Sequence, residues 1–318
     1  MSPISGTHLR LSCFGFSLTN TIFERAVYGI WKQVFAGDDG GYTDYFFRTL
    51  YKPENTLVLK ESGNIVSTLM RIPHSIMLAG HVLETSMILG VATIPSYRKR
   101  GCMHELMNDV LDEVEHRELV TLIQAYNPSM YTQFGFEMVY YRRRYSIHRS
   151  QIPLCSNEGL TYKVQSQDLL DVYTAYVRRF DGFYLRTKED FDHLQEECNA
   201  EGGKLIAYYD QNKQIQGYAS LYQTAQGIEV RECIYLNSVA LFKLLNLALQ
   251  LKPEIILHTT QDEHLEKIIQ GLTWQDYGFT MARINDYDLF NRLYGSAVTS
   301  PKEAFALSGK PLFMHEYA

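Results

Sequence analysis

The segment Leu89–Met103 reads LGVATIPSYRKRGCM and passes from an apolar strand pattern into a basic loop, Arg98-Lys99-Arg100-Gly101, that opens a helix. The first amides of a helix have no intrahelical partner and lie at the positive end of its dipole. Because Gly101 has no Cβ, an anion's oxygen can approach the backbone there. Taken alone, the loop fits a phosphate site and a solvated basic turn about equally well.

Helix and strand patterns alternate after this loop. One apolar stripe at helical spacing runs through residues 103–114 and contains Met103, Leu106, Met107, Val110, Leu111 and Val114. A buried strand is predicted over residues 120–125. Asn127-Pro128 then predicts the start of a short helix that ends at Gly135, and a last strand runs from residue 136 to about 148.

A meander precedes the loop. A strand pattern over residues 8–16 leads to a helix that Thr19 or Asn20 can cap, and the buried face of this helix includes Phe23, Val27, Ile30, Trp31 and Val34. A glycine-rich break at 37–41 and a helical stretch at 42–51 follow. Three extended runs are predicted over 56–61, 64–71 and 86–94, with a hairpin between the last two.

The second half of the chain repeats this order. Helices are predicted over 168–180 and after the capping box Thr187-Lys188-Glu189-Asp190, and three strands near 204–209, 214–222 and 228–236. A helix over 238–251, a strand over 254–258, a helix over 262–269 and an extended run over 279–284 complete it. The second half has Tyr235-Leu236-Asn237-Ser238 where the first half has its basic loop.

The aperiodic segment 150–160 is the predicted domain boundary. We therefore expect a first domain over residues 1–150, a second over 151–285 and a short tail over 286–318. Since only the first half keeps a phosphate-type loop, we expect a phosphate-binding site in the first domain alone.

Composition restricts the class of protein. The chain has 318 residues, of which 46% are hydrophobic and 21% charged, which fits two globular domains and excludes a disordered or low-complexity chain. The formal net charge of -6 provides no overall positive field for nucleic acid or an anionic membrane, so we expect neither as a partner.

Cysteine and histidine patterns point to a reducing compartment. Five scattered cysteines without a CxxC pair indicate neither a disulfide framework nor a zinc site, and no HExxH motif occurs, so we expect no metal. The N-terminus lacks the unbroken apolar run of a secretory signal, and no apolar stretch of 18 residues is present. A cytoplasmic location is expected.

Two motifs resemble the GNAT superfamily of acyl-CoA N-acyltransferases. The segment from Val91 to Met103 resembles its acetyl-CoA signature, Arg-x-x-Gly-x-Gly/Ala after a strand, and departs from it only in having Met103 as the last residue. The segment Tyr131–Phe136, YTQFGF, resembles the Tyr-x-x-Phe-Gly-Phe/Tyr end of the superfamily. Together with a following half that lacks the loop, these motifs make the chain resemble the enhanced intracellular survival (Eis) family.

The resemblance implies a mixed α/β fold made of two GNAT folds in tandem, assembled as a homo-oligomer. The family's C-terminal sterol-carrier-like domain would be truncated or absent here. Acetyl-CoA is the implied co-substrate. Backbone groups of Val91, Ala92 and Thr93 would hold its pantetheine arm and thioester carbonyl, and Tyr126 and Asn127 would line the thiol end. The residues implied for the pyrophosphate are Arg98, Lys99, Arg100, Gly101, Cys102, Met103 and His104.

The resemblance also implies catalytic groups. Tyr131 would protonate the departing CoA thiolate, which a tyrosine of pKa about 10 can do at neutral pH; the alternative is a packed aromatic in a chain with 23 tyrosines. In the Eis family the chain's own C-terminal carboxylate reaches the site, which makes Ala318 the candidate base. Glu316, Asp38 and Asp39 are its rivals.

Two further features are interpreted as structural. Cys102 lies at a predicted helix N-terminus, where a thiol pKa falls, but we expect its amide to matter rather than its thiol. The run Arg142-Arg143-Arg144 lies in an alternating strand, which favours an interdomain or solvated face over a nucleic-acid patch.

The predicted function is transfer of an acetyl group from acetyl-CoA to a primary amine of a small polycationic molecule, or to a lysine, by direct attack in a ternary complex. One rival is a tandem-GNAT transferase of the mycothiol-synthase type, which keeps its CoA motif in the C-terminal half. The other is a non-catalytic acyl-CoA-binding sensor or scaffold, which needs the basic loop but not Tyr131.

Overall fold

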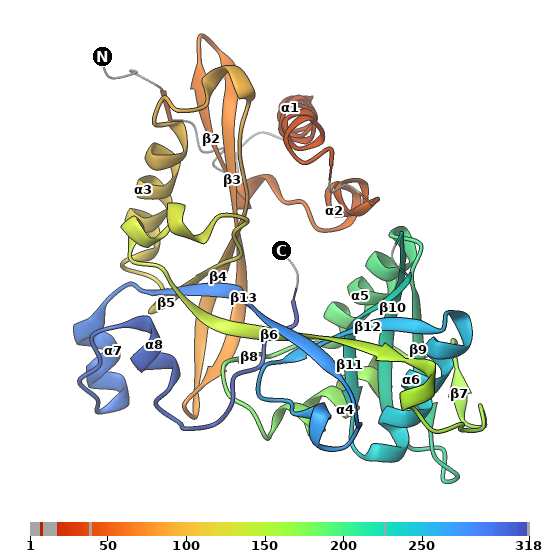
Figure 1. The fold of residues 1–318 in the computed structure, drawn as a ribbon. Coiled ribbons are helices and arrows are strands. Elements are labelled where there is room, and N and C mark those ends of the chain that lie inside the picture. Colours follow the sequence, from red (N-terminus) through yellow and green to blue (C-terminus); the bar gives the residue numbers. More distant parts are fainter. Residues whose placement is uncertain (1–6, 9–17, 38–39, 226, 317–318) are drawn as a thin grey trace.

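The computed structural model describes residues 7–8, 18–37, 40–225 and 227–316. Figure 1 shows two α/β halves joined through one continuous sheet, with the C-terminal segment ending between them. In the first half, helices α1 and α2 lie on one side of the strands and α3 lies on the other. The predicted mixed α/β class is confirmed.

The first half follows the predicted order of two helices, a meander and a helix between strands. Its elements are β1 (Thr7–His8), α1 (Leu18–Val34), α2 (Tyr42–Thr49), β2 (Thr56–Glu61), β3 (Asn64–Leu78), β4 (His81–Thr93), α3 (Cys102–Val114), β5 (Val120–Ile123) and β6 (Glu137–His148). The predicted strand over residues 8–16 falls mostly outside the described residues.

The second half has the same order of elements, apart from the short β8 between its first two helices. They are β7 (Leu160–Thr161), α4 (Ser166–Val177), β8 (Phe183–Tyr184), α5 (Lys188–Ala200), β9 (Lys204–Tyr209), β10 (Ile215–Thr224), β11 (Gly227–Tyr235), α6 (Ser238–Leu251), β12 (Glu254–Thr260) and β13 (Thr273–Ile284). The capping box at Thr187 and Asp190 opens α5 as predicted, and the Asn237 side chain caps α6.

The two halves exchange their last strands. In the sheet order β2-β3-β4-β5-β13-β6-β12-β11-β10-β9, β13 of the second half pairs with β5 of the first, and β6 of the first pairs with β12 of the second. The two exchanged strands also pair with each other, antiparallel. Each half is therefore completed by the other, and the boundary at residues 150 and 151 stays a prediction.

Two local predictions are wrong. Residues 262–269 form only a single 3-10 turn over Leu265–Lys267 instead of a helix, because Glu263 is buried and accepts hydrogen bonds from the Tyr176 and Tyr235 hydroxyls. Asn127 does not cap the helical turn after it with its side chain, since its Oδ1 accepts a hydrogen bond from Ser129 Oγ at 2.7 Å.

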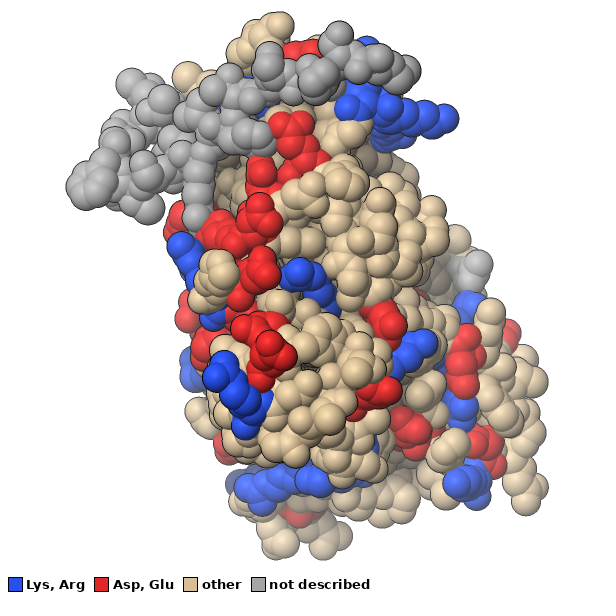
Figure 2. Space-filling model, turned by 90° about the vertical axis from the view of Figure 1, so that its left-hand side faces the viewer, with Lys and Arg blue, Asp and Glu red and all other residues tan. Residues whose placement is uncertain are grey.

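The arginine run is part of the interior where the halves join. Arg142 is fully buried, its guanidinium lies 4.7 Å from the Phe279 ring, and Nη2 donates to the Arg231 carbonyl. Arg143 is paired with Asp276 through two hydrogen bonds of 2.6 and 2.8 Å. Figure 2 shows a band of acidic side chains across one outer face of the molecule, with basic side chains beside and between them.

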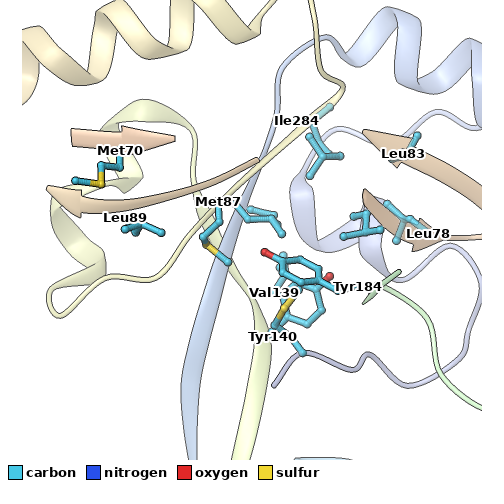
Figure 3. Packing of buried hydrophobic residues seen from close by; sticks show 14 of the residues in the cluster. Met70, Leu78, Leu83, Met87, Leu89, Val139, Tyr140, Tyr184 and Ile284 are labelled. Atoms are coloured by element: carbon cyan, nitrogen blue, oxygen red, sulfur yellow. The ribbon is translucent and has the colours of Figure 1, made fainter. Parts of the chain in front are cut away.

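The last thirty or so residues pack against both halves. Helices α7 (Tyr287–Tyr294) and α8 (Pro301–Phe305) bury Phe290 and Phe305 in the core of the first half, part of which is shown in Figure 3. Phe313 is buried in the core of the second half instead. The Asp181 amide donates to the Pro311 carbonyl at 2.9 Å, and the Phe313 amide donates to the Asp181 carbonyl at 3.0 Å.

Candidate functional site

The site begins where β4 and β5 separate. These parallel strands are paired from Thr85 with Val120 to Ile88 with Ile123, and the ladder stops there. Strand β4 continues to Thr93, so its edge from residue 89 onward has no partner strand on the β5 side. Unpaired backbone groups on such an edge can bind an extended ligand by adding hydrogen bonds to the strand.

A bulge in β4 lies at this opening. Thr68 is opposite Ala92 but Met70 is opposite Leu89, so β4 holds one extra residue between these pairs. Gly90 takes φ +61° there, and a Cβ on it would lie 2.0 Å from Trp31 Cζ2. The glycine thus lets the Trp31 indole pack against the backbone, and the bulge redirects the amide and carbonyl groups of the next residues.

The basic loop continues from the strand into α3. Lys99 and Gly101 have φ of +63° and +91°, and Gly101 is the N-terminal cap residue of α3. The first helical hydrogen bond to it comes from the Glu105 amide at 3.0 Å, which leaves the first-turn amides before Glu105 without intrahelical partners. A Cβ at Gly101 would meet no described atom within 4 Å, so the space above these amides is open.

A cavity of about 770 Å³ connects the strand opening with this loop. Most of the predicted ligand-binding residues line it, namely Val91, Thr93, Arg98, Lys99, Gly101, Cys102, Met103, His104, Tyr126 and Asn127. Of the described residues predicted for this site, Ala92 and Arg100 are not part of the lining. Ala92 is buried, its carbonyl accepting from Ser67 Oγ at 2.9 Å, and the Arg100 guanidinium lies 4.7 Å from the Tyr97 ring centroid.

Tyr131 lines the same cavity. Its ring packs with Phe134 and Phe136 in the core beneath α3, and only 8% of the residue is exposed. Desolvation by burial raises the pKa of its hydroxyl to about 12. A hydroxyl with this pKa keeps its proton at neutral pH, so it is available as a donor to an anion formed in the cavity.

The Cys102 thiol does not have the lowered pKa that is typical of a helix N-terminus. Burial raises its pKa above the ordinary value instead of lowering it. The sulfur points to the Tyr97 carbonyl, 3.7 Å away, and the side chain is part of the core beneath α3. The helix N-terminus therefore does not make this cysteine reactive, and its position in the cavity wall is that of a packed residue.

The C-terminal segment approaches the cavity. Gln124, in the cavity wall, donates from Nε2 to the Glu316 carbonyl at 2.5 Å. The Glu316 carboxylate is held elsewhere, by Arg186 Nε at 2.7 Å on Oε1 and by the His315 amide at 3.0 Å on Oε2. Ala318, Asp38 and Asp39, the other candidate bases, lie outside the described residues.

A second cavity of about 600 Å³ adjoins the first, and both are lined by Tyr42 and Leu89. Six acidic residues line the second cavity, namely Glu54, Glu189, Asp190, Glu197, Glu232 and Glu316. Only three basic residues do so: Lys52, Arg186 and Arg231. Its walls come from both halves, with α2 and β3 on one side and α5, β10 and β11 on the other.

Ion pairs occupy two of the basic groups. Arg186 holds Glu232 with hydrogen bonds of 2.9 and 2.7 Å in addition to Glu316, and Arg231 holds Glu201 at 2.9 and 3.0 Å. The remaining acidic groups leave the cavity with an excess of negative charge, which favours a cationic ligand. The sequence predicts a helix after Thr187 but not that this helix lines a cavity. The pattern that could indicate a polar cavity wall is the helical spacing of Asp190, His193 and Glu197.

Two absences concern the described part of the chain. Among these residues, no group of three or more His, Cys, Asp or Glu side chains is placed to hold a metal ion. None of the helices formed by them is both long and apolar enough to cross a bilayer.

Comparison with known proteins finds a family likeness in the first half. Residues 18–139 match the family model of the acetyltransferase (GNAT) domain. A search of curated protein sequences found no significant match.

Solved structures extend the likeness over both halves. A GCN5-related N-acetyltransferase from Anabaena variabilis has a TM-score of 0.70 and 18% identity, covering 88% of this chain and 73% of its own. A probable N-acyltransferase from Enterococcus faecalis has a TM-score of 0.70 and 17% identity, covering 83% and 70%. Eis1 from Mycobacterium abscessus has a TM-score of 0.65 and 16% identity, covering 87% and 74%. The predicted resemblance to the Eis fold is confirmed.

Proposed function

We propose that this protein is an acetyl-CoA-dependent N-acetyltransferase whose acceptor is a small cationic amine. The observation that carries the proposal is the junction of two cavities at Tyr42 and Leu89. One cavity combines an unpaired strand edge with a helix N-terminus, and the other is acidic. A thioester carrier in the first and an ammonium ligand in the second would bring carbonyl and nitrogen together at the junction.

Each end of acetyl-CoA has matching groups in the first cavity. The edge from Val91 to Thr93 offers backbone hydrogen bonds to the amides of the pantetheine arm. The first-turn amides of α3, with Arg98 and Lys99, offer donors and positive charge to the pyrophosphate. An amide near Val91 would stabilise the oxyanion that forms when the amine attacks the thioester carbonyl.

Tyr131 is the proposed general acid. As the carbon–sulfur bond breaks, the sulfur takes up the electron pair and needs a proton. Tyr131 lines the cavity and its hydroxyl has a raised pKa, so this group is protonated when the thiolate leaves. A non-catalytic acyl-CoA-binding protein would need the loop but not this hydroxyl.

Release of free CoA thiol tests the proposal. Wild-type protein with acetyl-CoA is expected to release thiol faster when an acceptor from a panel of polyamines, aminoglycosides, amino acids and lysine peptides is added. The acidic cavity predicts that acceptors with two or more ammonium groups give the lowest KM. Tight acetyl-CoA binding without thiol release for any member would favour the acyl-CoA-binding alternative.

A further inference from the structure

Glu197 differs from the other acidic residues of the second cavity. Glu232 and Glu316 are ion-paired with Arg186, and Asp190 accepts hydrogen bonds from the Thr187 amide and hydroxyl at 2.6 and 2.8 Å. Glu54 and Glu189 are exposed to solvent. Glu197 is half-buried in the cavity wall, and within the described residues its carboxylate has no hydrogen bond or ion pair.

Helix α5 places Glu197 in the wall of the second cavity, which meets the first at Tyr42 and Leu89. Two other residues of the helix, Phe191 and Cys198, are buried and fix its position. The start of α2 packs on the end of α5, since a Cβ on Gly41 would lie 2.7 Å from the Ala200 carbonyl oxygen, and Tyr45 donates to the His193 carbonyl at 2.9 Å. Tyr42, in the first turn of α2, lines both cavities and lies within the field of Glu197.

We propose that Glu197 is the general base that deprotonates the acceptor ammonium. This assignment rests on the proposed function, names a further catalytic residue for it, and differs from the sequence-based candidate, the carboxylate of Ala318. A carboxylate without a partner, in a half-buried wall next to the junction, is free to receive an ammonium proton directly.

The proton balance of the step is complete. Glu197 takes one proton from the ammonium, and the neutral nitrogen forms a bond to the thioester carbon. The carbon–sulfur bond then breaks, the thiolate takes its proton from Tyr131, and the second proton lost by the nitrogen restores Tyr131. Glu197 returns its proton to water when the amide product leaves, so each turnover releases one proton.

The surroundings of Glu197 suit this role. Desolvation, followed by the charge of Glu201, raises its pKa to about 7, with Glu232 acting in the same direction and Arg231 and Arg186 opposing it. The other titratable groups in its field are the hydroxyls of Tyr42, Tyr45 and Tyr222 and the thiol of Cys198. A base with a pKa near the working pH combines a large ionised fraction with sufficient basicity.

The test compares Glu197→Gln with the control Glu196→Gln. Glu196 is the exposed neighbour of Glu197 on α5, and both substitutions remove one negative charge. Wild type, with the most active amine of the panel, is expected to show kcat/KM rising with pH and levelling off above about 7. Glu197→Gln should lose about a hundredfold or more in kcat at pH 7 and lack this break, its rate rising further as the free amine forms. Glu196→Gln should match wild type.

Two outcomes overturn the inference while the proposed function stands. One is a Glu197→Gln protein that keeps the break near pH 7 or changes only KM, which would make Glu197 a binding group. The other is a wild-type chain extended by two glycines after Ala318 that loses the same activity, which would assign the base to the terminal carboxylate. Circular dichroism and unchanged acetyl-CoA affinity check that Glu197→Gln is folded. No thiol release by wild type with any amine overturns the proposed function itself.

Discussion

At the residue scale, the proposed mechanism depends on the hydroxyl of Tyr131. The motif around it predicted its role, but the residue type alone does not distinguish an acid from a packing aromatic. In the structure the ring is packed and the residue also lines the cavity. Packing and proton donation are therefore compatible, and only removal of the oxygen separates them.

Tyr131→Phe should keep acetyl-CoA affinity, since the ring still packs, and lower kcat by about a hundredfold. The pKa of about 12 means that the wild-type acid stays protonated through neutral pH. A CoA thiol has a pKa near 8.5 by analogy with cysteine, so the thiolate leaves more easily unaided at high pH and the deficit of the variant should shrink. A pH–rate profile of both proteins measures this. A variant within a few fold of wild type at every pH would remove Tyr131 from the mechanism.

Gly101 is the residue on which pyrophosphate binding depends. Gly101→Val adds a side chain in the open space above the first-turn amides, at φ +91°, and should weaken acetyl-CoA binding at least tenfold. Gly80→Val is the matched control, because Gly80 has φ +86° with equally open surroundings in the turn between β3 and β4. Calorimetry on both folded proteins measures the affinities, and equal binding by both variants would contradict the assignment.

At the scale of elements, local sequence patterns predicted most helices and the order of the meander, but the strands predicted over 64–71 and 86–94 extend further, as β3 and β4. The stripe from Met103 to Val114 became α3, and residues 238–251 became α6, because amphipathic spacing and capping side chains act within one segment. The bulge at Gly90 was not predicted, since it depends on Trp31 from a helix almost sixty residues earlier. Its only sequence signal is a glycine inside a strand.

The bulge gives a prediction about stability. Gly90→Ala combines φ +61° with a Cβ placed 2.0 Å from the Trp31 ring, and should lower the free energy of unfolding by about 2 kcal/mol or more, from backbone strain and overpacking together. Gly295→Ala, at φ +58° with nothing within 4 Å, should cost only the strain, about 1 kcal/mol. Denaturant unfolding compares them, and equal losses would show that the contact with Trp31 is not tight.

At the scale of the whole molecule, the sequence does not predict which strands of the two halves pair with each other. Strands β6 and β13 match their predicted ends at His148 and Ile284, yet nothing in their patterns says that each completes the other half. Pairing partners are chosen by contacts between segments distant in sequence. The acidic cavity was unpredictable for the same reason, since its walls α2 and α5 come from different halves of the chain.

The two halves have a similar order of helices and strands, but they differ as binding sites. Parallel pairing of β11 and β12 ends at Val230 and Leu257, as it ends early in the first half. Beyond that point, however, the Tyr235 hydroxyl donates a hydrogen bond to the Glu263 carboxylate. At the start of α6, the Asn237 side chain accepts a hydrogen bond from the Ala240 amide. The start of α6 is thus capped by a side chain, whereas the start of α3 has no side-chain cap.

One acetyl-CoA per chain is therefore expected. Calorimetric titration of the full chain should give a stoichiometry of one, and Gly101→Val should weaken that single event without revealing a second. Two equivalent binding events per chain would show that the opening between β11 and β12 also accepts acetyl-CoA.

The central claim, that the two cavities unite to transfer an acetyl group to an amine, is tested most directly by a mass balance. Wild-type protein is incubated with acetyl-CoA and the most active amine of the panel, and both the N-acetyl product and the free CoA thiol are quantified over time. The account predicts that they appear in equal amounts and that omission of the amine leaves only slow hydrolysis. Acetyl-CoA that binds and yet gives no N-acetyl product with any amine would contradict it.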